Sequence, residues 1–172
     1  RILISGGEIS RGNVGSSVEI FDPKTNKFEK VSAAMNSVRY KHDSVLLKNG
    51  NVLIFGGSDH RDRGGKLKTA EIFNPETQTF KPTGNMNFAR FKINQTATLL
   101  PNGKVLIAGG GNQAELFDPT TKSFEKASGS FGKSLHYGTV TPLKDGRILI
   151  IGGYEFVQNG EPTSTDQAWI YN

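Results

Sequence analysis

The sequence predicts an all-β protein that forms a β-propeller segment of four blades, two complete and two partial, with four antiparallel strands in each complete blade. Three observations predict it. Glycine pairs end four apolar runs, 50, 53 and 43 residues apart, at Gly6-Gly7, Gly56-Gly57, Gly109-Gly110 and Gly152-Gly153. Asn-Gly or Asp-Gly precedes three of these runs, and such pairs between apolar runs are the strongest short signal for a hairpin, normally with a type I′ turn. The composition, with 21 glycines and 11 phenylalanines, suits short strands joined by turns.

Each repeat contains up to four strand-forming runs, which we name A to D in chain order. The A runs are 43–47, 96–100 and 138–143, and the B runs, which lead into the glycine pairs, are 1–5, 51–55, 104–108 and 147–151. The C runs are 18–21, 70–73, 114–117 and 168–171, and the D runs are 27–31, 79–83 and 123–127. A four-stranded repeat of about 50 residues is typical of a propeller blade. A solenoid is the structural alternative, but its repeats are usually shorter and hold fewer elements.

The order of residues within a repeat has a physical explanation in a propeller. A blade buries its faces against its neighbours, so the glycine pair removes side chains where two backbones meet. The single aromatic on each D run is Phe28, Phe80 or Phe124. We expect these rings to fill the space between blades, which widens away from the propeller axis.

The paired glycines after an apolar strand and the later aromatic resemble the kelch repeat, and the resemblance covers essentially the whole chain. The run "LLPNGKVLIAGG" is similar to bacterial kelch proteins and to propeller domains of the galactose-oxidase type, rather than to the BTB-associated kelch proteins of animals. One departure is that Phe replaces the usual Trp of the last strand, while Trp169, the one tryptophan, lies on a C run.

We expect residues 1–172 to form a single segment of a larger propeller, with blade pieces at about 1–35, 36–86, 87–131 and 132–172. The first piece lacks its A strand and the last its D strand, which leaves fourteen strands. The resemblance implies a closed ring of about six or seven blades. Two open blade faces would expose apolar surface, so the remaining blades are expected from the same chain or from a second copy.

The connections predict which side of the propeller is functional. The A–B and C–D turns are short and lie on one side, which we call the turn face. The B–C and D–A connections are longer and unequal and lie on the opposite side, which we call the loop face. Variable loops on a rigid scaffold usually carry binding.

Basic residues of the loop face supply the candidate ligand-binding residues. Arg39, Arg90 and Lys133 occupy D–A segments before the inner strands and are expected near the channel mouth, where Arg suits carboxylates and phosphates. The full candidate set is Arg39, His42, His60, Arg61, Arg63, Arg90, Lys133 and His136. The net charge of +5 agrees with an acidic ligand. The alternative is that these are solvated loop charges.

Several kinds of chemistry are not expected. With no cysteine in the chain, the copper site with a cross-linked tyrosine of galactose oxidase is excluded here. The three histidines lie on different blades or loops without metal-ligand spacing, so neither a metal nor another cofactor is expected. The basic loop 60–68 has no interleaved aromatics, which makes nucleic acid an improbable partner. No apolar run reaches the length of about 18 residues that a membrane helix needs.

The leading functional hypothesis is a non-catalytic binding module whose B–C and D–A loops hold a protein or glycan partner of acidic character. The alternative, implied by the family resemblance, is a sugar enzyme of the acidic-sugar epimerase or mutarotase kind, with Arg39, Arg90, His42 and His136 at the channel mouth. The chain begins inside an apolar run without a Met and is interpreted as an internal or mature fragment. The absence of cysteine agrees with an extracytoplasmic location, whether secreted, periplasmic or at the cell surface.

Overall fold

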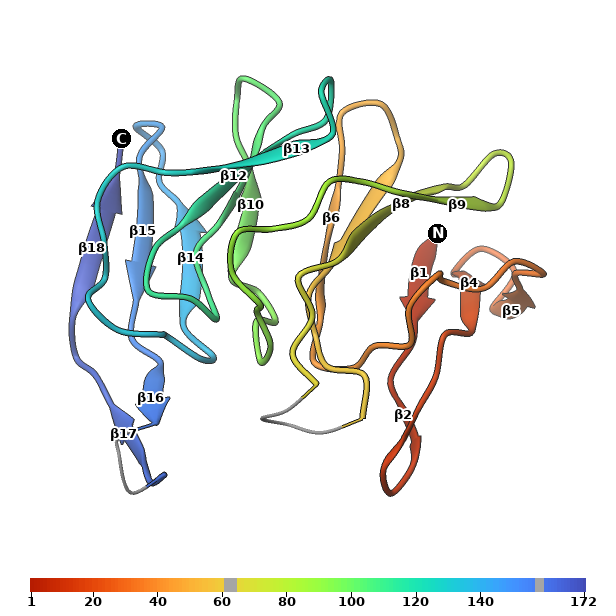
Figure 1. The fold of residues 1–172 in the computed structure, drawn as a ribbon. Helices are drawn as coiled ribbons and strands as arrows, with labels where there is room; N and C mark the ends of the chain where they lie inside the picture. Colours follow the sequence, from red (N-terminus) through yellow and green to blue (C-terminus); the bar gives the residue numbers. More distant parts are fainter. Residues whose placement is uncertain (61–64, 157–159) are drawn as a thin grey trace.

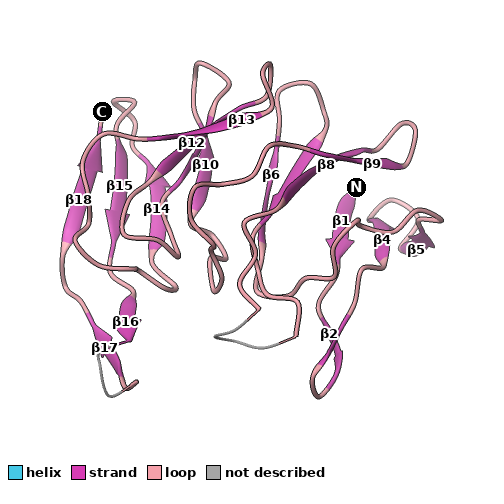
Figure 2. Ribbon diagram, viewed as in Figure 1, coloured by secondary structure: helices cyan, strands magenta, loops and turns pink. Residues whose placement is uncertain are grey.

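A computed structural model describes residues 1–60, 65–156 and 160–172, and these residues form strands, turns and loops without a helix (Figures 1 and 2). Four antiparallel sheets follow one another along the chain. They have three, four, four and three strands, which confirms the all-β prediction of two complete and two partial propeller blades. We number these sheets blades 1 to 4 in chain order.

The strands of each blade pair in chain order. Blade 1 contains β1 (Ile2–Ser5), β4 (Val18–Asp22) and β5 (Lys27–Lys30). Blade 2 contains β6 (Asp43–Leu46), β7 (Val52–Phe55), β8 (Ala70–Asn74) and β9 (Thr79–Pro82). Blade 3 contains β10 (Ala97–Leu99), β11 (Val105–Ile107), β12 (Glu115–Asp118) and β13 (Ser123–Lys126). Blade 4 contains β14 (Thr139–Pro142), β15 (Ile148–Ile151) and β18 (Ala168–Tyr171).

The A–B turns differ in detail from the predicted type I′ form, which needs positive φ at both central residues. In blade 2 only Gly50 is left-handed, at φ 82°. Its N–H donates to the Leu47 carbonyl, and Asn51 N–H donates to the Asn49 side chain. This pattern is a turn closed by a left-handed glycine, with Asn held by its own side-chain hydrogen bond. Blades 3 and 4 repeat it around Gly103 and Gly146.

The glycine pairs lie where neighbouring blades touch. Gly56 has φ 63°, and a Cβ added there would lie 2.6 Å from the carbonyl oxygen of Arg90, at the entry to blade 3. Gly57 N–H donates to that same carbonyl at 2.7 Å. A side chain at Gly56 would therefore push two blades apart.

The core lies between the blades rather than within one sheet. One buried cluster joins blades 2 and 3 and includes Phe55, Ile107 and Phe117. Two further clusters join blades 1 and 2 and blades 3 and 4. Each D-strand Phe packs on the C-strand Phe opposite it, with ring centroids 4.8 Å apart in blades 1 to 3. The inner strand β10 lies between β6 and β14.

Two hairpins within the B–C connections were not predicted as strands. β2 (Glu8–Ser10) pairs with β3 (Asn13–Val14), and β16 (Tyr154–Phe156) pairs with β17 (Pro162–Ser164). Figure 1 shows both hairpins extending from the lower edge of the molecule, opposite the A–B turns at the top. The loop face is thus partly built from ordered β structure.

Candidate functional site

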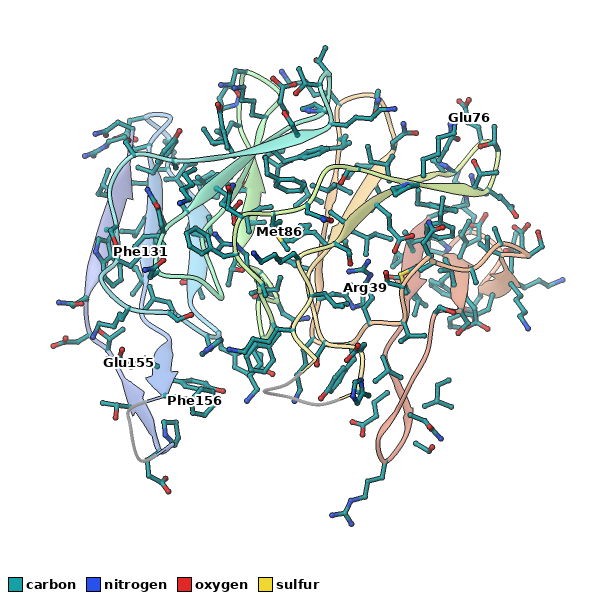
Figure 3. All side chains as sticks on the ribbon, in the orientation of Figure 1. Arg39, Glu76, Met86, Phe131, Glu155 and Phe156 are labelled. Carbon is teal, nitrogen blue, oxygen red and sulfur yellow. The ribbon has the colours of Figure 1, made fainter. Side chains whose placement is uncertain are left out.

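Arg39 and Arg90 are fully buried rather than open at the channel mouth as expected. Figure 3 shows Arg39 in the interior of the molecule. The Arg39 Nη2 donates to Glu71 Oε1 at 2.9 Å, and Nη1 donates to the Gly56 carbonyl at 2.6 Å. In blade 3, Nε and Nη2 of Arg90 donate to Glu115 Oε1 at 3.0 and 2.9 Å. Both guanidinium groups are therefore buried and bound by protein acceptors, although Arg39 Nε has no hydrogen-bond partner among the described residues, and burial closes them to a ligand.

An asparagine three residues before each arginine completes the same arrangement. The N–H and Nδ2 of Asn36 donate to Glu71 Oε2 at 2.8 and 2.9 Å. The corresponding groups of Asn87 donate to Glu115 Oε2 at 2.6 and 2.8 Å. We call each Asn-x-x-Arg segment with its glutamate a clamp. Burial lowers the pKa of both arginines, and the paired carboxylates offset part of this desolvation.

The clamps tie neighbouring blades together. While the side chains bind the glutamate of their own blade, the carbonyl groups of Arg39 and Arg90 accept hydrogen bonds from Gly7 and Gly57 of the preceding blade. In blade 4 the carbonyl of Leu135 accepts from Gly110 in the same way. A sequence signal for the clamps was available. The similar segments "MNSVR" and "MNFAR", which contain the clamp Asn and Arg, each precede a similar C run, "AEIF" or "AELF", which contains the clamp Glu.

The described histidines do not form a shared site. His42 Nε2 lies 3.0 Å from Ser5 Oγ, and burial followed by the charge of Arg39 lowers the pKa of His42 to about 4. His136 is buried against Phe91, and burial lowers its pKa as well. His60 is exposed beside Asp59. Within the described ranges, no group of three or more His, Cys, Asp or Glu side chains could hold a metal ion.

The remaining candidates have separate positions. Lys133 forms an ion pair with Glu155 of β16 at 3.4 Å. Arg61 and Arg63 lie outside the described residues. The described candidates therefore do not form one cluster. Arg39 and Arg90 lie in the two buried clamps, His42 and His136 are enclosed, and His60 and Lys133 lie on the loops.

A ring of left-handed residues at the entry to the inner strands was missed by sequence reasoning. Lys41, Lys92 and Tyr137 each stand two residues after the clamp position and have φ of 53°, 57° and 53°. Lys92 N–H donates to the Lys41 carbonyl at 3.0 Å, and Tyr137 N–H donates to the Lys92 carbonyl at 2.9 Å. We call these three residues the mouth ring. A left-handed conformation costs a non-glycine residue about 1–2 kcal/mol, so packing of the blades must hold it.

Aromatic side chains adjoin the mouth ring. Lys92 Nζ donates to Tyr154 Oη at 3.0 Å and lies 5.0 Å from the ring centroid of Phe156. Lys66 Nζ lies 4.8 Å from the ring centroid of Phe91. Figure 3 shows Phe156 at the lower edge, where the hairpin of blade 4 extends. The mouth ring together with Lys66, Phe91, Tyr154 and Phe156 is the loop-face cluster, which combines ammonium groups with aromatic faces.

A cavity lies on the turn face, which is the side that the connections did not predict to be functional. This cavity, of about 490 Å³ between blades 2 and 3, is lined by the A–B turns of both blades and by Asp118 to Thr120. Its lining combines Lys48 and Lys104 with backbone and amide groups. Lys104 is already engaged by Glu125 and Asp118.

Comparison with known proteins matches a kelch motif to residues 44–87, which cover blade 2 and the start of the following connection. An F-box/kelch-repeat protein of Arabidopsis thaliana is 32% identical over 105 residues, which are 60% of this chain and 22% of the relative. The chain thus spans about a fifth of the relative's length. The relative is a plant protein, so the expectation of a bacterial subtype gains no support from it. The described part of the chain has no helix with the length and hydropathy of a membrane span.

Proposed function

Because the chain belongs to the kelch-repeat family, we propose that it is a non-catalytic binding module that holds a protein partner of acidic character on its loop face. The mouth ring is the observation that carries this proposal. Three successive blades place equivalent left-handed residues side by side, two of them lysines, at the entry to the inner strands. Strained backbone held in register by packing is a frequent feature of binding sites.

The loop-face cluster supports the same partner chemistry. Its ammonium groups can bind carboxylates, and the half-buried rings of Tyr154 and Phe156 offer apolar area at low entropic cost. Tyrosine is one of the side chains enriched in binding hot spots.

A glycan is the second ligand class that this cluster supports, because aromatic rings offer flat apolar faces for sugar rings. We also propose that the protein acts outside the cytoplasm. Its sequence has no cysteine, so it has no thiol that an oxidising compartment could oxidise. Arg39, Arg90, His42 and His136, the residues suggested for a sugar enzyme, are bound to or packed against other groups of the protein. We therefore do not propose an enzymatic function from them.

The test is a charge reversal on the loop face. The wild-type protein is immobilised and used to capture binding proteins from a cell extract. The Lys41→Glu/Lys92→Glu variant should fail to capture these proteins. The Lys144→Glu variant, which reverses an exposed charge on the turn face, should still capture them. Retention should fall as salt rises, because charge pairs are screened. Enzymatic removal of glycans from the extract distinguishes the two ligand classes. Partners that bind the double variant as well as the wild type would place binding elsewhere.

A further inference from the structure

Glu19 of blade 1 occupies the position that Glu71 and Glu115 hold in blades 2 and 3. On each C strand this glutamate pairs with an apolar residue of the B strand, Ile4, Ile54 or Ile107 respectively. Glu71 and Glu115 are buried within their clamps, whereas Glu19 is exposed. Its side chain makes no hydrogen bond or ion pair with any residue of the described ranges.

The surface around Glu19 matches surface that is covered elsewhere in the molecule. Ile2 and Ile4 are 55% and 43% exposed. Their counterparts in blade 2, Val52 and Ile54, pack in the cluster between blades 1 and 2. Phe28 is 62% exposed, whereas its counterpart Phe80 is partly buried in that cluster.

Blade 4 shows that the glutamate and the clamp segment change together. The clamp arginine is replaced there by Leu135, the asparagine by Gly132 and the glutamate by Trp169, whose ring packs on Phe131 at 5.2 Å. The backbone hydrogen bonds fix this alignment, because Met35, Met86 and Phe131 donate to equivalent B–C carbonyls. A glutamate at this position therefore accompanies an arginine in both described clamps, and its loss accompanies the loss of the arginine.

We infer that Glu19 and the apolar residues beside it form a docking site for an Asn-x-x-Arg segment of a further repeat unit in the same polypeptide. Charge complementarity identifies the occupant, since both internal copies of this carboxylate bind one guanidinium and one asparagine. In those copies the arginine precedes its glutamate by 32 and 25 residues. The same spacing places the occupant on the N-terminal side of β1.

A second copy of residues 1–172 does not supply this occupant. Its two clamp arginines are bound inside their own blades, and the third equivalent position is Leu135. The inference does not depend on the proposed partner, because the docking face is the flank of blade 1 and not the loop face.

Carboxyl footprinting of the protein as its gene encodes it tests the inference without a mutation. Carbodiimide with glycine ethyl ester labels accessible carboxylates, and mass spectrometry gives the rate at each site. Glu19 should be protected at least tenfold relative to Glu76, an exposed residue of the blade 2 turn, and as strongly as Glu71 and Glu115. Labelling of Glu19 at the Glu76 rate overturns the inference, as does protection that disappears on dilution, which would indicate a second molecule.

Thermal unfolding of variants in the same full-length protein provides a second measurement. Glu19→Gln and Glu71→Gln should each lower Tm by about 5 °C, because both changes weaken a buried ion pair. Glu76→Gln is the matched control and should leave Tm unchanged. A Glu19→Gln variant that melts like the control contradicts the docked clamp.

Discussion

His42 and Asp43 are adjacent in the sequence, and their shifted pKa values give stability opposite dependences on pH. Burial lowers the pKa of His42 from 6.5 to about 4. Burial also raises the pKa of Asp43 from 3.8 to about 6, although Ser44 and Thr96 donate backbone hydrogen bonds to it. The two effects oppose each other between about pH 4 and 6, so the wild type conceals both.

The sign follows from the protons bound in each state. Between pH 6.5 and 4 the unfolded chain binds a proton at His42 that the folded chain does not, so this contribution to stability is lost as pH falls. Between pH 3.8 and 6 the folded chain keeps a proton on Asp43 that the unfolded chain has released, so that contribution is lost as pH rises.

We therefore expect His42→Gln to lose less stability than the wild type on acidification from pH 7 to pH 4.5, by about 2 kcal/mol. Asp43→Asn should lose more than the wild type over the same interval, because only the His42 effect remains. Urea unfolding at both pH values measures the two differences. An unchanged pH dependence in both variants would show that neither group is desolvated as the structure indicates.

At the scale of the element, the clamps attach the D–A connections that lead into blades 2 and 3 to the C strands of these blades. Arg90→Leu leaves Glu115 buried without its cation, and we expect a loss of about 3–5 kcal/mol in the free energy of unfolding. Arg90→Leu/Glu115→Leu should lower the free energy of unfolding by no more than Arg90→Leu alone. The double change also removes the unpaired carboxylate and leaves apolar side chains at both positions, as in blade 4.

Lys104→Leu is the matched control for that pair. Lys104 forms a solvent-accessible ion pair with Glu125, and because such pairs contribute little, this change should leave the free energy of unfolding nearly unchanged. Urea denaturation of the three variants gives the comparison. A double variant much less stable than Arg90→Leu would mean that the hydrogen bonds of Asn87 and Phe88 to Glu115 dominate the clamp, rather than the ion pair.

At the scale of the whole molecule, stability comes from the contacts between blades. Ile107 is fully buried in the cluster between blades 2 and 3, and Ile107→Ala should cost about 2–5 kcal/mol through lost burial and the cavity left behind. Ile9→Ala removes the same atoms from the exposed hairpin β2 and should cost less than about 0.5 kcal/mol. Similar losses for the two variants, measured by urea unfolding, would contradict a core placed between blades.

The blade architecture could be predicted because its signals are local. A β-branched run, an Asn-Gly or Asp-Gly turn and a glycine pair each restrict the backbone within a few residues, and their recurrence specifies the order of strands. The left-handed residues of the mouth ring carry no such signal, because Lys and Tyr do not favour positive φ by themselves. The hairpins β2–β3 and β16–β17 were missed because their strands are only two or three residues long.

The sequence by itself determined the all-β class, the four repeats, the pairing order within each blade and the side of the blades on which the long connections lie. Only the tertiary structure decided where Arg39 and Arg90 point, since their glutamates lie 32 and 25 residues farther along the chain. From sequence alone, a charged side chain is expected at the surface, because the buried carboxylate that pairs with it is known only from the fold. The physical reason is that the strands and turns follow from neighbouring residues, whereas burial, ion pairing and the left-handed residues of the mouth ring follow from how the blades pack together.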